Sequence, residues 1–186
     1  PPSEKRLVLM PFGTYDGDAT EERLSFVTEA VRGWLSSCSS PPTTLIDVGC
    51  GDGSLMRRLI HERVPIQRMI GVDCLIEQRA SKRLASALSE AMSVDGYNLP
   101  EVQLLRGSFR EMSGGDASFM TCVEVVEHLD PPELNAFGEV LLGRCKPSYL
   151  LVTTPNKEYN LNFMKRPDEW PKEGEAPQAV PPPDVY

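Results

Sequence analysis

Apolar residues recur with helical spacing in three stretches of the chain. In the first stretch, Glu21 to Leu35, they form one stripe, which predicts an amphipathic helix. The stripe consists of Leu24, Val27, Val31 and Leu35. Thr20 is suited to cap this helix, and a Ser/Pro run over 36–42 ends it. The patterns of Leu55–Arg63 and Glu77–Met92 predict two more helices.

Short apolar runs bounded by turn residues alternate with these helices. They are Thr43–Val48, Arg68–Asp73, Val102–Arg106, Ser118–Val123 and Tyr149–Thr154. Runs of this length and composition are typical of buried parallel strands. Asp130, followed by two prolines, can cap a further helix. Alternating strands and helices predict an α/β fold, a doubly wound and mostly parallel sheet with helices on both faces.

The two ends of the chain lack this periodicity. Residues 1–19 carry Pro and Gly without a clear period, so we expect a loop or lid there. Residues 161–186 are polar and rich in proline, which predicts a flexible tail. The compact domain is therefore assigned to residues 20–160.

Composition narrows the classes of function. The net charge of −8 over 186 residues argues against an extended nucleic-acid surface, because phosphate contacts need clustered Lys and Arg. No apolar stretch reaches the roughly 20 residues that span a bilayer, so we expect no membrane partner. Five dispersed cysteines form no metal-type pair and are expected to be reduced thiols. A cytoplasmic protein is the expectation, with the nucleus as the alternative.

A glycine-rich turn follows the first predicted core strand. Asp47-Val48-Gly49-Cys50-Gly51-Asp52-Gly53 lies between that strand and a helix, the context that a cofactor turn requires. Asp47 and Asp52 would repel a pyrophosphate but can pair with an amino group, which favours S-adenosylmethionine over NAD. Asp73, which ends the next strand, is placed to bind a ribose diol. The turn, with Gly49 and Gly51 as its binding glycines, resembles motif I of the class I (Rossmann-like) methyltransferases; the alternative is a purely structural turn.

Three more residues are candidates for cofactor contact. Ser108 and Phe109 follow the third core strand, where class I methyltransferases, which the chain resembles, usually contact adenine. Phe109 could stack on the base or could simply be core. Cys122 ends another strand; we count it among the cofactor-binding candidates, although core packing is the ordinary role of such a cysteine.

Two carboxylates and an imidazole follow Cys122 within a few positions. Glu124, Glu127 and His128 offer oxygen and nitrogen donors that suit Mg²⁺ or Mn²⁺. A divalent ion there could bind two neighbouring hydroxyls of a sugar and lower the pKa of one, which would aid attack on a sulfonium methyl group. The alternative is that some of these residues serve the fold or the cofactor.

The chain resembles the Hen1 family of small-RNA 3′-terminal 2′-O-methyltransferases over residues 20–160. The resemblance is carried by Glu-Val-Val-Glu-His at Glu124–His128, by Thr-Pro-Asn-Lys-Glu-Tyr-Asn at Thr154–Asn160, and by the segment before motif I, Thr20–Val27. It implies that Glu124, Glu127 and His128 are catalytic residues and three of four metal ligands. It also implies methyl transfer to the 3′ end of a small RNA, and an Argonaute- or Piwi-type protein carrying that RNA as the candidate partner.

The chain departs from this family in its histidines. The family's fourth ligand is a second histidine after the Thr-Pro-Asn segment, whereas the other histidine here is His61, on the helix after motif I. His61 is expected at a helix end, and the fourth ligand is expected beyond Tyr186.

The basic residues considered for phosphate contact are Arg23, Arg57, Arg58, Lys157, Lys165 and Arg166. Solvated charge is the ordinary role of each, and Lys157 and Arg166 are the two we favour.

Two other functions stay open on the sequence alone. The same acids and histidine could serve a methyltransferase acting on a small-molecule diol or a quinone precursor. A chain without the fourth ligand could also be a cofactor-binding scaffold without activity.

Overall fold

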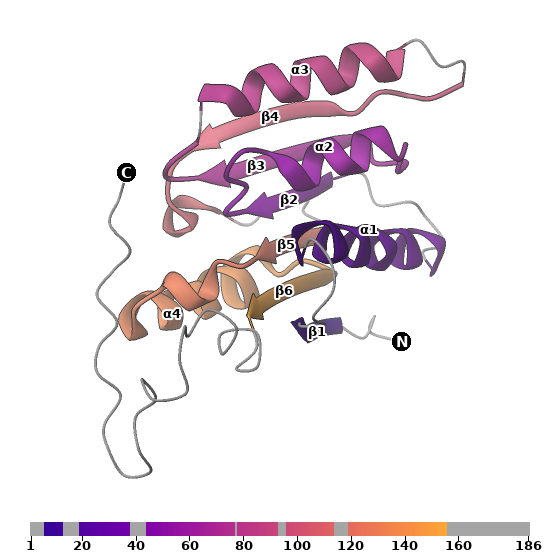
Figure 1. The fold of residues 1–186 in the computed structure, drawn as a ribbon. Helices are drawn as coiled ribbons and strands as arrows, with labels where there is room; N and C mark the ends of the chain where they lie inside the picture. The colour runs from indigo at the N-terminus through magenta and orange to yellow at the C-terminus, as the bar shows by residue number, and fades with distance from the viewer. Residues whose placement is uncertain are drawn as a thin grey trace, which may run out of the picture.

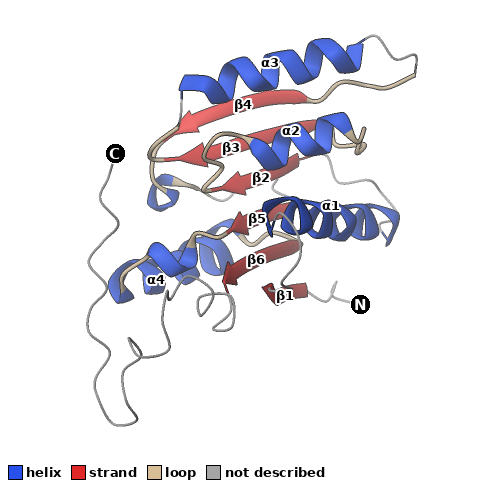
Figure 2. Ribbon diagram, viewed as in Figure 1, coloured by secondary structure: helices blue, strands red, loops and turns tan. Residues whose placement is uncertain are grey.

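The computed structural model describes residues 6–12, 19–37, 44–76, 78–92, 96–113 and 119–155. Within them six strands form one parallel sheet in the order β1-β6-β5-β2-β3-β4 (Figures 1 and 2). The strands are β1 (Arg6–Phe12), β2 (Thr44–Val48), β3 (Arg68–Asp73), β4 (Glu101–Arg106), β5 (Phe119–Val123) and β6 (Tyr149–Pro155). The longer helices are α1 (Ala19–Ser37), α2 (Ser54–His61), α3 (Gln78–Met92) and α4 (Pro131–Gly138). Shorter turns are η1 (Phe109–Glu111), η2 (Val126–His128) and the π-helical η3 (Glu139–Cys145).

The predicted elements are present, with bounds that shift by only a few residues. The predicted strand Arg68–Asp73 matches β3 at both ends. The predicted cap of α4 is confirmed, because the Asp130 Oδ1 atom accepts a hydrogen bond of 2.8 Å from the backbone N–H of Glu133.

One prediction is corrected at the amino-terminal end. Residues 1–19 were expected to form a loop or lid, but Arg6–Phe12 is the strand β1, which pairs in parallel with β6. Pro11 lies inside this strand, opposite Thr154. Proline is tolerated there because β1 is the edge of the sheet and needs a partner on one side only. The predicted tail, 161–186, lies outside the described residues.

Side chains that alternate along the strands build a core on each face of the sheet. Phe119 and Leu151 belong to the core under α1, α2 and α3, which lie together on one side of the sheet (Figure 1). Met120 and Val152 belong to the second core, which α4 and η3 cover. Two covered faces explain why β2 and β5 are buried along most of their length. The predicted doubly wound α/β architecture is thereby confirmed.

An aromatic stack anchors α1 to the sheet. The ring of Trp34 lies parallel to that of Phe119, with centroids 5.5 Å apart, and also stacks on Tyr149 at 5.1 Å. Phe119 is fully buried, and it stacks on Tyr149 as well. Since α1 forms one wall of the cavity described below, this stack also positions that wall.

None of the described helices combines the length and apolar character that a membrane-spanning helix requires.

Replacing Phe119 with alanine should remove the centre of this stack and leave a cavity. We expect the free energy of unfolding to fall by about 3–5 kcal/mol, measured by urea denaturation. Met92→Ala, at a position 71% exposed at the end of α3, is the control and should change it by less than about 0.5 kcal/mol. Equal effects of the two substitutions would contradict the role assigned to the stack.

Candidate functional site

The order of the strands creates a crevice at one edge of the sheet. From β2 the chain continues outward through β3 to β4, and then returns to β5 on the other side of β2. The connections after β2 and β5 therefore lead away from each other, and ligands of open α/β sheets bind between such diverging ends. The predicted glycine turn follows β2 and the predicted metal residues follow β5, so the fold brings the two segments to the same crevice.

Gly49 is where these two segments touch. Its φ of +77° is unfavourable for other residues, and a Cβ atom there would lie 2.2 Å from the Cγ2 atom of Val125. The Gly49 N–H donates to the carbonyl of Val72 at 2.8 Å. A side chain at position 49 would therefore force the cofactor turn and the acidic turn apart.

Asp73 ties the glycine turn to β3. Its Oδ2 atom accepts a hydrogen bond of 2.8 Å from the N–H of Gly51, and its Oδ1 atom accepts one of 2.7 Å from the N–H of Leu75. Each carboxylate oxygen keeps a further acceptor position. Asp73 thus stands at the strand end predicted for it, held by backbone donors on both oxygens.

Asp52 forms an ion pair with an arginine of α3. Its Oδ1 atom accepts hydrogen bonds from the backbone N–H and the hydroxyl of Ser54, and its Oδ2 atom pairs with Arg83 of α3. Arg83 was not predicted from the sequence. It lies 31 residues after Asp52, so there is no local signal for the pair, which depends on how α3 packs.

Asp47 is buried beneath the turn. Only 3% of the residue is exposed, and its Oδ1 atom accepts a hydrogen bond of 2.8 Å from the hydroxyl of Thr121 on β5. Burial raises the pKa of Asp47 to about 7; the Thr121 hydrogen bond opposes this shift and the nearby charge of Asp73 adds to it. A positively charged ligand in the crevice would favour its ionised form.

The remaining cofactor candidates are less exposed to the crevice. Cys122 is fully buried within the second core, and burial raises the pKa of its thiol. Phe109 is buried as well and meets Phe137 edge to face at 5.4 Å. The Ser108 hydroxyl accepts a hydrogen bond of 3.2 Å from the N–H of Arg110. Phe109 and Cys122 thus belong to the second core, and cofactor contact stays a prediction for these two residues and for Ser108.

Glu124 is fixed at the end of β5. Its φ of +55° is unusual for a residue with a side chain. Its N–H donates to the carbonyl oxygen and the hydroxyl oxygen of Thr153, at 3.2 and 3.1 Å, and the Thr153 hydroxyl donates to Oε1 at 2.8 Å. The other oxygen, Oε2, lies 2.9 Å from Nη1 of Arg23 on α1.

The other two predicted metal ligands lie close by on η2. Burial raises the pKa of Glu127, and the charge of Glu124 raises it further, while a backbone hydrogen bond lowers it. The His128 side chain is 74% exposed, with Nε2 4.0 Å from Oε1 of Glu127. Among the residues described here, no three His, Cys, Asp or Glu side chains are gathered closely enough to hold a metal ion.

The donors nevertheless suit a cation. Two carboxylates, one of them with a raised pKa caused partly by the other, disfavour each other's charge, and a positive ion between them would relieve this repulsion. A cation is in fact present at Glu124, the guanidinium of Arg23. The donor atoms of Glu124, Glu127 and His128 therefore suit a divalent ion by their chemistry, and to bind one ion together these side chains would have to come closer.

A cavity of about 240 Å³ lies between the glycine turn and Glu124 at the end of β5. Four of the predicted cofactor residues line it, together with Glu124 and Arg23; the four are Asp47, Gly49, Gly51 and Asp52. Arg23 was expected to be solvated surface charge, whereas its side chain is only 19% exposed. The lining does not include the other predicted site residues, which are Asp73, Ser108, Phe109, Cys122, Glu127 and His128.

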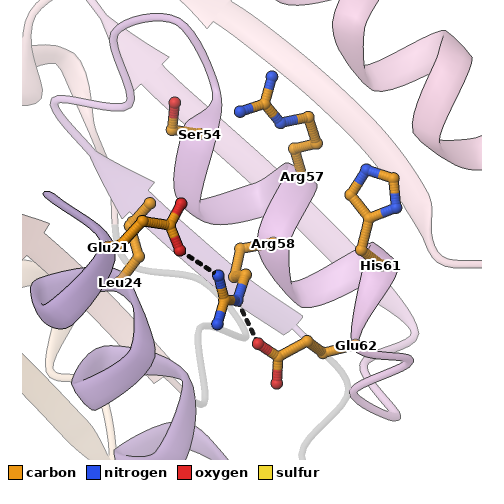
Figure 3. Close-up of a pocket in the computed structure, with 7 residues that line it drawn as sticks. All are labelled: Glu21, Leu24, Ser54, Arg57, Arg58, His61 and Glu62. Atoms are coloured by element: carbon orange, nitrogen blue, oxygen red, sulfur yellow. Dashed lines mark hydrogen bonds and ion pairs between the residues drawn. The ribbon is translucent and has the colours of Figure 1, made fainter. Parts of the chain in front are cut away.

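A second hollow, of about 420 Å³, adjoins the first between α1 and α2 (Figure 3). Leu24 and Ser54 line both. Arg58 lies between Glu21 and Glu62 and forms ion pairs with both. His61 ends α2, as expected, with Nδ1 3.8 Å from Oε2 of Glu90. Lys157, Lys165 and Arg166 lie outside the described residues.

Comparisons with known proteins agree on one group of relatives. No protein-family model matches the chain. A small RNA 2′-O-methyltransferase of Arabidopsis thaliana is 30% identical over 182 residues, 97% of this chain and 18% of that protein. The one of Rattus norvegicus is 36% identical over 126 residues, 66% of this chain and 32% of that protein. The chain thus spans a fifth to a third of these two relatives.

Solved structures give the same result. The crystal structure of small RNA methyltransferase HEN1 aligns with a TM-score of 0.66 at 30% identity, covering 88% of this chain and 19% of that one. The methyltransferase domain of bacterial CtHen1 aligns with a TM-score of 0.60 at 31% identity, covering 76% of this chain and 69% of that one.

The buried Asp47 predicts a pH dependence of stability. Its pKa is raised from 3.8 to about 7 in the folded protein, so folding favours its protonated form. Its contribution to the free energy of unfolding is fully present below about pH 4 and is lost as pH rises to about 7, a decline of up to about 4 kcal/mol. Asp47→Asn, whose amide oxygen can still accept from Thr121, should remove this decline in urea titrations at several pH values. Glu101→Gln, at a side chain 69% exposed, should retain it; an unchanged slope in Asp47→Asn would contradict the assignment.

Proposed function

We propose, because the chain belongs to the Hen1 family of small RNA methyltransferases, that it transfers a methyl group from S-adenosylmethionine to an RNA. The acceptor we propose is the 2′-hydroxyl of the 3′-terminal nucleotide of a small RNA, with a divalent ion, Mg²⁺ or Mn²⁺, assisting. The observation that carries the proposal is the convergence of the glycine turn and Glu124 on one cavity at the switch point of the sheet.

The cofactor side of this cavity is suited to S-adenosylmethionine. Asp73 can accept hydrogen bonds from both hydroxyls of a ribose through the free positions on its two oxygens. The glycine turn lets the ligand approach the backbone closely. Asp47 and Asp52 lie in the lining; a ligand with an amino group and a sulfonium centre would favour the ionised form of Asp47, whereas a pyrophosphate would disfavour it.

The residues that would hold the ion follow β5: Glu124 lines the cavity, and Glu127 and His128 come after it on η2. Glu124, Glu127 and His128 supply donors typical of Mg²⁺ and Mn²⁺ sites. A bound ion would lower the pKa of a coordinated ribose hydroxyl. Glu124 contributes most to placement, because Thr153 fixes its carboxylate and its backbone. The exposed imidazole of His128 can turn toward an entering nucleotide.

The transfer itself is a single displacement. The 2′-oxygen forms a bond to the methyl carbon, the bond from carbon to sulfur breaks, and S-adenosylhomocysteine leaves with the bonding electron pair. The hydroxyl proton must leave the oxygen, and we propose His128 or Glu127, whichever side chain does not bind the ion, as the group that accepts it. Holding cofactor and hydroxyl in one cavity supplies the alignment that such a displacement needs.

The proposed substrate reconciles an acidic chain with RNA. A net charge of −8 disfavours a long phosphate footprint, whereas recognition of one terminal nucleotide needs few phosphate contacts. An Argonaute- or Piwi-type protein that binds the body of the RNA would leave such an end available to the cavity. We propose this type of protein as the carrier of the substrate.

Cofactor binding should depend on Asp73. In Asp73→Asn an amide NH₂ would face the N–H of Gly51 or Leu75, so one backbone donor would lose its acceptor. We expect the affinity for S-adenosylhomocysteine, measured by calorimetry, to fall at least about tenfold. Asp130→Asn, which keeps the helix cap, is the control and should bind as the unmodified protein does. Equal affinities in the two variants would exclude Asp73 from the cofactor site.

The acceptor prediction concerns the end of the RNA. With labelled cofactor and Mn²⁺, a short RNA that ends in a 2′,3′-diol should be methylated. The same RNA should not be methylated when its last nucleotide is 2′-deoxy, nor after periodate oxidation, which cleaves the diol to two aldehydes and leaves no 2′-hydroxyl. Equal methylation of oxidised and intact ends would contradict the proposed diol recognition. Methylation of catechol in place of RNA would favour a small-molecule substrate.

A further inference from the structure

Arg23 and Glu124 form an ion pair across the cavity. Arg23 belongs to α1 and Glu124 follows β5, and their atoms Nη1 and Oε2 lie 2.9 Å apart. The two side chains are only 19% and 17% exposed. An ion pair so shielded from water is costly to leave half broken, so Glu124 requires a cation whenever it is ionised.

The two partners differ in how firmly they are held. Thr153 holds the Glu124 backbone and its Oε1 atom, through hydrogen bonds that do not involve Arg23. Arg23 reaches the same carboxylate at the end of a long side chain, which has many rotamers available. The contact between Oε2 and Arg23 can therefore be exchanged without disturbing the strand end.

α1 is held in place by other residues. Arg58 of α2 pairs with Glu21, and Arg32 of α1 pairs with Glu62 at 3.0 Å. The stack of Trp34 on Phe119 adds an apolar anchor. Loss of the contact between Arg23 and Glu124 would therefore move a side chain and leave the helix where it is.

The other acids that line the cavity do not pair with Arg23. The three acids that line the cavity are Asp47, Asp52 and Glu124. Asp47 is bound to Thr121, and Asp52 is neutralised by Arg83. Glu124 is thus the acid of the cavity lining that pairs with Arg23.

We propose that Arg23 is the exchangeable counter-cation of Glu124, which it neutralises until a divalent ion binds and displaces it. The proposal rests on the metal site of the proposed function. A divalent ion coordinated by Oε2 at about 2.0–2.2 Å would stand next to the guanidinium, and two positive charges in so shielded a place repel each other. In the metal-free protein Thr153 then positions the Glu124 carboxylate, and Arg23 supplies its counter-charge.

The test is the affinity for Mn²⁺ alone, measured on metal-free protein by electron paramagnetic resonance of the unbound ion. Arg23→Gln removes the competing charge, so Mn²⁺ should bind about fivefold to tenfold more tightly. Arg57→Gln, which removes an arginine from the neighbouring hollow, is the matched control for net charge and should change the affinity less than about twofold. Glu124→Gln should weaken binding strongly.

A double-mutant cycle covers the case in which binding is weak. The free energy of unfolding is measured for the unmodified protein, Arg23→Gln, Glu124→Gln and the double variant. With a chelator present, the effects of the two single substitutions should not add, which reports coupling between the positions. In excess Mn²⁺ this coupling should vanish. Arg23→Lys, which keeps the charge without the guanidinium, serves if Arg23→Gln does not fold, and should give a smaller change in affinity.

Three results would overturn the proposal: unchanged or weaker Mn²⁺ binding in Arg23→Gln, coupling that survives excess Mn²⁺, or no Mn²⁺ binding in any variant. Failure here is distinguishable from failure of the proposed function. RNA methylation that needs no metal would leave the methyl transfer standing without this exchange. Tighter Mn²⁺ binding in Arg23→Gln without RNA methylation would keep the exchange and remove the function.

Discussion

The reversal of strand order at β2 is the constraint on which the site depends. Because β3 lies on one side of β2 and β5 on the other, the connections that leave the carboxyl ends of β2 and β5 separate and leave room between them. Gly49 keeps that room narrow, since its missing side chain lets Val125 approach the cofactor turn. The remaining features of the site, including the tether from Asp73 to Gly51 and the bonds from Thr153 to Glu124, position groups around this gap.

Charge is the second determinant of the site. Three acidic side chains line the cavity, and the charge of each is accommodated differently. Asp47 is buried with a raised pKa, Asp52 pairs with Arg83, and Glu124 pairs with Arg23. An acidic cavity next to a glycine turn is what a cationic methyl donor and a divalent ion would favour, and what a dinucleotide would not. The family relationship and this distribution of charge therefore support the proposed chemistry independently of each other.

Much of the fold could be predicted from the sequence, because apolar periodicity and turn residues report local structure directly. The match of β3 and the cap at Asp130 show this. The strand β1 was missed because Pro11 resembles a loop residue, and only its place at the sheet edge makes a proline acceptable. The glycine turn and Glu124 could be found from spacing, since the chemistry of each is contained in a few consecutive residues. Arg23, Arg83 and Thr153 could not, because their roles depend on which helix or strand packs beside the turn. The roles assigned to Glu124, Glu127 and His128 stay predictions.

The central claim is that this cavity directs a methyl group to one oxygen at the end of an RNA. The most direct measurement is the position of the methyl group in a short RNA after incubation with S-adenosylmethionine and Mn²⁺, by nuclease digestion and mass spectrometry of the nucleosides. The account predicts a 2′-O-methyl group on the last nucleoside and no other. A methyl group on a base or an internal ribose would contradict it, as would an RNA that stays unmethylated while the protein binds the cofactor.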